Sequence, residues 1–468
     1  MNNPSFDRRR FLAGSGIAAG ALASAPGIQL HAKEAHPDLP HNIIHLVSDG
    51  MSMGTLTCAD YLSQIMRKRG LVWVDLLDRQ EASTCFVNMR SLDSYVTDSS
   101  AASSSWGGGK RINNGAVNML PGMKPVTPIY EILKGEGWQR GLVTTTEITH
   151  ATPAGFGSSV PKRSMGEDIA EQYLQRNIDV LLGGGSKHFD KSKRKDGKDL
   201  AGEYKAKGYK LMSRAADLEK APSRQRWLGL FASGHLPYTV DHMNDPELKK
   251  AVPTLATMTK AALKRLTGKK RFMLQVEGGR VDHGCHSCDA IGAFRDQIAF
   301  DEALEACLEH QQSHPETLLV ITTDHGNGNP GLNGTGANYV GSNALLANLS
   351  DATASLGVML SRMGKTPTIL QIRKVIEEAT GYKVPGAKAE IFQRFLNKKG
   401  GALYEMMNKP SNQLGQLLAN HWAIGWAGSA HTADYVPLTA VGPGAENFSG
   451  FIQNTDVFDH YMKFAGVK

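Results

Sequence analysis

The sequence predicts an α/β protein built on one large, mainly parallel β-sheet flanked by helices, with an inserted cap region. Two observations predict this fold. Short, almost wholly apolar runs recur along the chain, and segments with helical patterning separate them. Such alternation is typical of a parallel sheet that helices cover on both faces. Several of the apolar runs also end at an acidic residue, which places polar groups at the carboxyl ends of the strands.

Six apolar runs are expected to form strands: residues 41–48, 141–145, 179–182, 271–276, 317–323 and 435–441. Three of them are followed directly by an acidic residue, namely Asp49, Glu277 and Asp324. In a parallel sheet these carboxylates would converge on one crevice beyond the strand ends. The last run contains Pro437, which cannot donate a hydrogen bond to a ladder, so we expect this strand at an edge of the sheet.

Helical patterns lie between these strands, at residues 127–135, 166–177, 253–267 and 290–312. We expect a single domain of residues 33–468 that carries two insertions. Residues 186–250 are polar and rich in lysine, and residues 331–425 hold further helices, such as 368–380. Because the second insertion separates Asp324 from His431, we expect it to form a cap over the crevice.

Composition excludes several classes of function. The chain has 468 residues, 41% of them apolar, so it can bury a large core. Its net charge is +7, but the basic residues cluster in local runs such as 187–195, and no Lys/Arg stripe is interleaved with aromatic residues. We therefore expect no nucleic-acid partner. No stretch after the N-terminal segment reaches the roughly 18 apolar residues of a membrane span, so we expect no membrane partner either.

Residues 1–32 have the pattern of a bacterial twin-arginine export signal and are set apart from the fold. Residues 8–10 are three arginines, and an apolar run rich in Ala and Gly follows them up to residue 25. The small residues at 23–25 fit cleavage after Ala25, but Pro26 follows that position. Cleavage near Ala32 fits equally well. The mature protein is therefore expected to be periplasmic or secreted.

The five cysteines do not suggest a disulfide framework, because they are few and odd in number. Proteins exported by the twin-arginine route usually fold beforehand in a reducing compartment, where disulfides are rare. Cys285 and Cys288 bracket His286, which raises a thiolate metal site as an alternative to the carboxylate ligands described below.

A run of small residues begins at Asp98, which is predicted to cap a helix. Ser99 and Ser100 follow, and no bulky side chain occurs before Trp106. A hydroxyl just after such a cap faces unpaired backbone N–H groups and the positive end of the helix dipole, where an alkoxide or a phosphate is stabilised. Taken alone, the stretch also fits an ordinary capped helix start.

Together with this stretch, five other segments occur in an order that resembles the alkaline phosphatase family of homodimeric, metal-dependent phosphomonoesterases. The segments are Asp-Gly-Met (49–51), Thr-Asp-Ser-Ser-Ala-Ala (97–102), Ala-Thr-Pro-Ala (151–154) with Arg163, Glu-Gly-Gly-Arg-Val-Asp-His-Gly-Cys-His (277–286), Thr-Asp-His (323–325) and Ser-Ala-His-Thr (429–432). The resemblance implies the family's fold, a homodimer, and phosphate monoesters as small-molecule substrates.

The resemblance also implies three metal sites. Mixed carboxylate and imidazole ligands suit zinc, and two such sets are implied: Asp282, His286 and His431, and Asp49, Asp324 and His325. A serine oxygen would complete the second set. Oxygen ligands alone suit magnesium, and a third site of this kind is implied by Asp49, Thr152 and Glu277.

The sequence departs from part of the family near the third site. His150 stands where some members have Asp, and His283 stands where some have Lys. Members with histidines at these places exist, so the departure concerns the third metal rather than the fold. An imidazole nearby weakens a preference for magnesium and favours zinc or cobalt.

The resemblance assigns roles to three further residues. Ser99 is expected to be the nucleophile, because it directly follows Asp98 and stands seven residues before the aromatic Trp106. Ser100 is the neighbouring candidate. Arg163 is expected to bind two phosphate oxygens with its planar fork, and Asp98 to orient this arginine. The implied reaction is hydrolysis through a phosphoserine, with the two zinc ions on the attacking and leaving oxygens.

Other readings of the same residues remain open. A phosphodiesterase or another phosphate- or sulfate-ester hydrolase of the superfamily would use similar metals, although a sulfatase usually has Cys or Ser followed by x-Pro-x-Arg, which neither Ser99 nor Ser100 has. A cofactor-independent phosphoglycerate mutase should lack an export signal. A non-catalytic phosphate-binding protein would not need a serine beside two metal sites.

Overall fold

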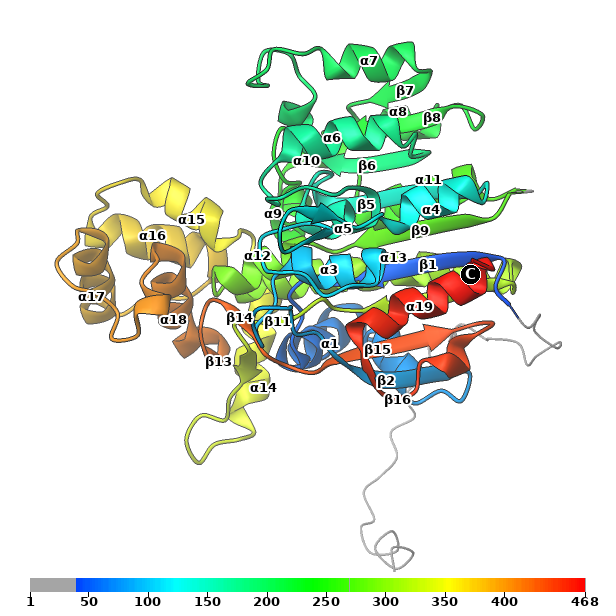
Figure 1. The fold of residues 1–468 in the computed structure, drawn as a ribbon. Coiled ribbons are helices and arrows are strands. Elements are labelled where there is room, and N and C mark those ends of the chain that lie inside the picture. Colours follow the sequence, from blue (N-terminus) through cyan, green and yellow to red (C-terminus); the bar gives the residue numbers. More distant parts are fainter. Residues whose placement is uncertain (1–38, 269, 468) are drawn as a thin grey trace, which may run out of the picture. The chain divides into compact units, whose positions relative to one another are not determined.

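The centre of the protein is a ten-stranded sheet (Figure 1) with the strand order β16-β2-β15-β10-β1-β9-β5-β6-β8-β7. The computed structural model describes residues 39–268 and 270–467, so the predicted export signal lies outside the described residues. In that order the strands are Gly450–Gln453, Ala82–Asn88, Val436–Val441, Thr317–Thr322, Asn42–Val47, Phe272–Glu277, Gln139–Glu147, Val180–Gly184, Arg226–Leu230 and Tyr209–Met212.

The sheet is mainly parallel, as predicted. Every adjacent pair of strands runs parallel except the two pairs that involve β15, which is antiparallel to both β10 and β2. All six runs expected to be strands lie in this sheet. The α/β fold class is therefore confirmed.

The prediction that the strand with Pro437 lies at an edge is wrong. β15 lies between β10 and β2, in the interior of the sheet. Pro437 is tolerated because it is the second residue of β15 and lies just outside the ladder with β10, which begins at the pair Leu438–Thr322. Its carbonyl also accepts a hydrogen bond of 3.0 Å from the Thr322 hydroxyl. Because Pro437 precedes the first residue of β15 that pairs with β10, its missing N–H removes no hydrogen bond between these two strands.

Four strands of the sheet were not predicted: β2, β7, β8 and β16. β7 and β8 belong to the lysine-rich residues 186–250 and extend one side of the sheet, so this region adds to the central layer. β16 has four residues, and β2 alternates between exposed and buried positions. Neither forms the continuous apolar run that marks a strand covered on both faces.

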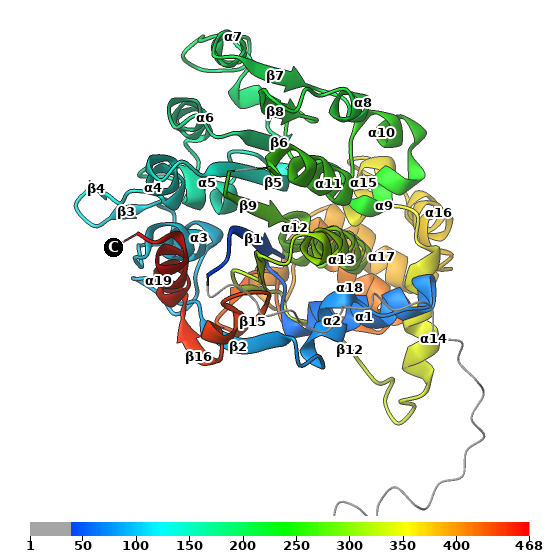
Figure 2. The same cartoon turned by 90° about the vertical axis from the view of Figure 1, so that its right-hand side faces the viewer.

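Helices cover both faces of the sheet (Figure 2), and alternate residues of each strand serve the two layers. In β1, Ile44 and Leu46 belong to one core and Ile43 and Val47 to the other. The first core is completed by α1 (Met53–Arg67), α2 (Val72–Leu77), α11 (Leu255–Leu266) and α13 (Ala290–Ser313). The second is completed by α3 (Ser99–Gly108), α4 (Ile129–Gly135), α5 (Ala151–Gly157), α6 (Gly166–Gln175) and α19 (Asn454–Ala465).

Three adjacent strands bring the predicted carboxylates to one edge of the sheet. β1 pairs with β9 and with β10, and Val47 stands opposite both Glu277 and Thr322. Asp49 and Asp324 each follow two residues after these positions. The carboxylates expected to converge beyond the strand ends therefore come together where β10, β1 and β9 end.

Residues 331–425 form a group of helices beside this edge of the sheet (Figure 1). They comprise α14 (Gly341–Ala347), α15 (Leu356–Met363), α16 (Ile369–Thr380), α17 (Gly386–Leu396) and α18 (Pro410–Trp422). Short strands β12 (Pro330–Leu332) and β13 (Ile424–Trp426) pair at the base of this segment.

No single helix of the described residues is long and apolar enough to cross a membrane. One bent pair, Gly341–Asp351 with Leu356–Met363, meets the criterion by length and composition, with an angle of 65° between its parts. Apolar residues of this pair, including Leu346, Leu356 and Met359, are buried in the core of the protein.

Candidate active site

Three groups of side chains at the crevice have ligand atoms within 4.8 Å of one another. We call them the first, second and third groups. The first consists of Asp282, His286 and His431, the second of Asp49, Asp324 and His325, and the third of Asp49, His150 and Glu277. The structure thus brings together all of the carboxylates and imidazoles that the sequence implied as metal ligands.

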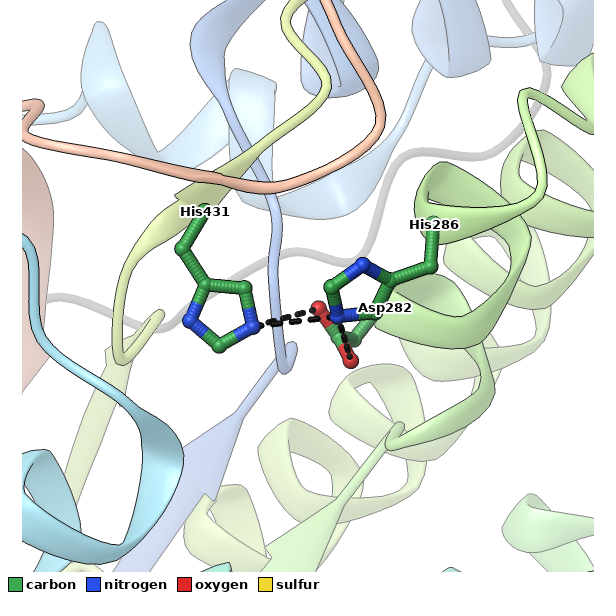
Figure 3. Close-up of side chains that lie close together, drawn as sticks. All are labelled: Asp282, His286 and His431. Carbon is green, nitrogen blue, oxygen red and sulfur yellow. Dashed lines mark hydrogen bonds and ion pairs between the residues drawn. The ribbon is translucent and has the colours of Figure 1, made fainter. Parts of the chain in front are cut away.

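The first group lies where α12 (Arg280–His286) faces the chain that follows β13 (Figure 3). Asp282 and His286 are four residues apart and share one face of α12. His286 Nε2 lies 3.4 Å from Asp282 Oδ2 and 3.1 Å from His431 Nε2, and His431 Nε2 lies 3.6 Å from Asp282 Oδ1. The Asn327 amide donates to Asp282 Oδ1 over 2.6 Å and holds this carboxylate in place.

Backbone carbonyls orient the imidazoles. Nδ1 lies 2.8 Å from the Ser429 carbonyl in His286 and 2.9 Å from the Thr97 carbonyl in His431. In His325 the corresponding distance to the Gly326 carbonyl is 3.2 Å. A carbonyl only accepts, so each Nδ1 carries the proton and each Nε2 keeps a free lone pair. This is the tautomer that binds a metal through Nε2.

The second group is wholly buried. His325 Nε2 lies 3.2 Å from Asp324 Oδ2 and 3.5 Å from Asp49 Oδ1. Burial raises the pKa of Asp49 well above its ordinary value, and the charges of Asp324 and Asp282 raise it further. The Asp324 carboxylate is also buried, but the nearby His325 lowers its pKa.

The third group contains the predicted oxygen ligands and one imidazole. Thr152, in the first turn of α5, directs its hydroxyl at Asp49 Oδ2 over 3.5 Å. Glu277 Oε2 accepts hydrogen bonds from the hydroxyls of Thr144 and Thr146. His150 Nδ1 lies 4.0 Å from Glu277 Oε1, so this histidine does lie at the third group.

The donor atoms fit cations. Four buried atoms of the second and third groups have no hydrogen-bond partner within the described residues: Asp49 Oδ1, Asp324 Oδ2, Glu277 Oε1 and His150 Nδ1. Buried carboxylate oxygens without partners are costly unless a cation neutralises them. The first and second groups mix imidazole and carboxylate, which suits zinc, whereas the third is rich in oxygen.

Ser99 and Ser100 point to different partners. Ser99 is the first residue of α3, after the cap Asp98, and its Oγ lies 3.3 Å from His325 Nε2. The Ser100 hydroxyl lies 2.8 and 2.7 Å from the two carboxylate oxygens of Asp98. Only Ser99 therefore presents its oxygen to the second group.

Arg163 is held at the site by Asp98. Its Nη1 donates to Asp98 Oδ2 over 3.0 Å, and its Nη2 lies 3.4 Å from His150 Nε2. Asp98 also accepts from the backbone N–H groups of Ala101 and Gly115. Burial opposes ionisation of Asp98, but the Arg163 charge and these hydrogen bonds lower its pKa below the ordinary value. Asp98 thus stays ionised beside the arginine.

Two further histidines lie beside the third group. The ring centroid of His150 is 5.6 Å from those of both His283 and His235, and the latter two are 4.4 Å apart. His235 was not predicted, because it stands alone in a loop after β8 with no ligand at a recognisable spacing.

His283 and His235 present N–H groups rather than lone pairs. Arg280 donates to His283 Nδ1 over 2.7 Å, and the Glu147 backbone N–H donates to His235 Nδ1 over 3.1 Å. Neither donor can accept, so in both rings the proton is on Nε2. Burial lowers the pKa of His235 to about 4 and that of His283 well below its ordinary value, which keeps both rings neutral. His283 therefore offers no lone pair to a metal ion in this arrangement.

The cysteines do not form a thiolate site. Cys285 and Cys288 are buried, and burial raises the pKa of both thiols, that of Cys288 to about 12. Cys285 Sγ contacts the Thr55 hydroxyl, away from the first group. The carboxylate and imidazole ligands account for the site without them.

The helix that carries Ser99 is packed unusually closely. All ten residues of α3 are buried, and most are Ser, Ala or Gly. A Cβ on Gly107 would lie 2.1 Å from the Gly155 carbonyl of α5, and one on Gly155 would lie 2.4 Å from Ser103 Oγ. Backbone packs directly against backbone here, so small residues are required along both helices.

Comparison with known proteins agrees with this geometry. The family model for alkaline phosphatase matches residues 40–467. Alkaline phosphatase 3 of Bacillus subtilis (strain 168) is 30% identical over 459 residues, which cover 97% of this chain and 94% of that protein. Streptomycin-6-phosphate phosphatase of Streptomyces griseus is 31% identical over 356 residues, covering 66% of this chain and 79% of that protein.

Solved structures show the same likeness. Alkaline phosphatase of Thermus thermophilus has 35% sequence identity and a TM-score of 0.86, with 92% of each chain covered. The cold-active enzyme of a Shewanella species has 26% identity and a TM-score of 0.74, covering 91% of this chain and 99% of the other. The family model and these relatives agree with the fold and the three ligand groups, and the chain belongs to the alkaline phosphatase family.

Proposed function

We propose that this protein hydrolyses phosphate monoesters through a phosphoserine intermediate on Ser99. The observation that carries the proposal is the position of Ser99 Oγ, 3.3 Å from His325 Nε2 at the N-terminus of a buried helix. A hydroxyl that only capped a helix would not need a ligand group beside it. The neighbouring Asp98–Arg163 pair supplies the cation that a phosphate requires.

The ligand groups support two zinc ions, in the first and second groups, and a third ion of the magnesium type held by Asp49, Thr152 and Glu277. When bound, these ions supply Lewis acidity at the attacking and leaving oxygens. His150 adds a nitrogen to the third group and favours a softer ion there.

The residues of the chain divide the remaining work between them. Arg163 binds two phosphoryl oxygens and fixes the phosphorus in front of Ser99. Ser99 Oγ then attacks phosphorus, the bond from phosphorus to the alcohol oxygen breaks, and the alcohol leaves with a proton. The backbone N–H groups at the start of α3 face the developing negative charge. In the second step water attacks the phosphoserine, which releases inorganic phosphate and restores the hydroxyl.

Hydrolysis of p-nitrophenyl phosphate with and without a chelator tests the proposal. We expect the activity to disappear on chelation and to return with zinc and magnesium together. Full activity in protein stripped of metal would contradict the metal-dependent reaction. Tight binding of inorganic phosphate without turnover would instead indicate a phosphate-binding protein, and faster hydrolysis of bis(p-nitrophenyl) phosphate than of the monoester would indicate a diesterase.

We also propose export by the twin-arginine route and assembly into a homodimer. The three arginines before an apolar run support the first proposal, and the family resemblance supports the second. N-terminal sequencing of the protein from a bacterial periplasm should show a chain that begins near residue 26 or 33. Light scattering should give twice the mass of one chain; an uncleaved cytoplasmic protein or a monomer would contradict the respective proposal.

A further inference from the structure

We propose that the helices of residues 331–425 hold the first ligand group in its metal-binding geometry, and that Asn412 is the positioning residue through which they do so. This inference deepens the proposed function and rests on it, since it concerns the affinity of the first group for zinc. It assigns a role to a segment whose sequence carries no recognisable site.

The argument begins at the end of α12. His286 is the last residue of this helix, so its carbonyl has no partner within the helix. Two residues later Cys288 has a φ of 51°, a left-handed conformation that a residue other than glycine adopts only at a cost. The C-terminal end of α12, from His286 to Cys288, thus depends on contacts with other parts of the protein.

Asn412 supplies one of these contacts. Its Nδ2 donates to the His286 carbonyl over 3.0 Å and lies 3.4 Å from Cys288 Sγ. Asn412 is completely buried in the first turn of α18. A buried amide that donates to an otherwise unpaired helix carbonyl is typical of a group that fixes the position of a chain end.

The segment also acts on the side chain of His286, through Ser429, which follows it in the chain. His286 Nδ1 bonds to the Ser429 carbonyl over 2.8 Å, and the Ser429 hydroxyl donates to the carbonyl of Met406. Met406 lies in the short helix Glu405–Met407, just before α18. Residues 331–425 therefore restrain both the backbone and the imidazole of His286.

Close packing enforces the same placement. A Cβ on Gly415 of α18 would lie only 2.3 Å from the Cys288 carbonyl and 2.9 Å from its Cβ. The helix thus lies directly against the chain that follows His286. The His286 side chain is 33% exposed, whereas His325 of the second group is fully buried, so the first group has less support from the core.

The consequence is specific to one of the two zinc-type groups. Partners of a metal ligand that are not ligands themselves typically change metal affinity by about 10- to 100-fold when they are removed. Asn412→Leu keeps the branched shape and the number of heavy atoms of the side chain but removes the donor, and Gly415→Ala pushes α18 away from Cys288. We expect both variants to release one zinc per chain about tenfold faster or more, and the other zinc at the normal rate.

The test measures zinc release to a chromogenic chelator from the zinc-loaded full-length protein. Gly386→Ala is the matched control, because Gly386 begins α17 in the same segment and a Cβ there would contact nothing within 4 Å. A His286→Ala background supplies the second control. If Asn412 acts through His286, adding Asn412→Leu to that background should not further speed the release of zinc from the first group.

Three outcomes would overturn the inference. They are zinc release within about twofold of the wild-type rate in both variants, equal acceleration of both zinc ions, and an undiminished effect of Asn412→Leu in the His286→Ala background. Equal acceleration would show a general loss of stability, which thermal unfolding of the metal-free variants would also report. A wild-type protein that binds no zinc at the first group would instead contradict the proposed function itself.

Discussion

Replacing Ser99 and Ser100 separately by alanine gives the sharpest test of the proposed mechanism. The two hydroxyls are adjacent in α3, but only Ser99 Oγ lies within 3.3 Å of His325 Nε2. Ser99→Ala removes the attacking oxygen, and loss of a nucleophile costs about 10³-fold or more in kcat. Because Ser99 adds only one oxygen beside the second group, its carboxylates and imidazole should still bind metal at close to the normal content.

The expected effect of Ser100→Ala is much smaller. Ser100 donates one hydrogen bond to Asp98, which still accepts from Ala101, Gly115 and Arg163 over 2.9 to 3.0 Å. A hydrogen bond to a charged group contributes about 1.5–3 kcal/mol. If that free energy acted wholly on the transition state, kcat/KM would fall roughly 10- to 150-fold. Since three donors continue to hold Asp98, we expect a smaller loss.

The assay combines kinetics with chemical trapping. The kcat/KM for p-nitrophenyl phosphate and the metal content are measured for both variants, and the phosphoenzyme of the wild-type protein is trapped at low pH. Mass spectrometry of its peptides should place the phosphate on Ser99. Phosphate on Ser100, or an equal loss of activity in both variants at full metal content, would refute the assignment of the nucleophile.

Four further predictions follow from the site and its surroundings. Metal analysis of the active protein should find close to two zinc ions and one further ion per chain, and fewer than one zinc would contradict the two-zinc proposal. His150→Asp should raise the affinity for magnesium, because it replaces an imidazole at the third group by an oxygen ligand; an unchanged magnesium titration of the rate would show that His150 plays no part there. Arg163→Lys should lower kcat/KM by roughly 10²-fold and weaken inhibition by inorganic phosphate, because Lys cannot bind two oxygens in a fork. An unchanged inhibition constant for phosphate would exclude Arg163 as the phosphate ligand. Burial lowers the pKa of His45 from 6.5 to about 3, so the unfolded chain binds a proton below pH 6.5 that the folded protein does not bind, and stability is lost as the pH falls. At pH 4.5 the free energy of unfolding lost in this way is about 2–3 kcal/mol. In urea unfolding of the metal-free proteins, the free energy of unfolding of His45→Phe should therefore change less between pH 6.5 and 4.5 than that of the wild-type protein. An equal change in both proteins would contradict the lowered pKa of His45.

The sequence was most informative where an acidic residue directly follows an apolar run that forms a strand. Asp49, Glu277 and Asp324 follow apolar runs, and the parallel register of β1 with β9 and β10 necessarily brings such positions together. The convergence of these three carboxylates could therefore be predicted from the strands, whereas the full set of expected metal ligands was implied by the family resemblance. Strands β2 and β16, which lie at one side of the sheet, gave no such signal, because both are partly exposed and neither forms a continuous apolar run.

Other parts of the site depend on tertiary contacts that leave no local pattern. His235 meets His283 only because β8 joins the sheet beside β6, and nothing around residue 235 marks it. Asn412 is an ordinary first-turn helix residue until α18 docks against His286. The edge prediction for the strand with Pro437 was wrong for a related reason. A proline in the sequence shows that one backbone N–H donor is missing, but not at which residue the hydrogen bonds between β15 and β10 begin.

The close packing of α3 against α5 bears on how the protein behaves when it loses its metals. Because the Ser99 helix is fixed by backbone contacts such as that of Gly107 with Gly155, its position does not depend on ions in the crevice. A demetallated protein should therefore keep Ser99, Asp98 and Arg163 in place. Reconstitution should then require only that metal ions refill the three ligand groups, without refolding of the chain.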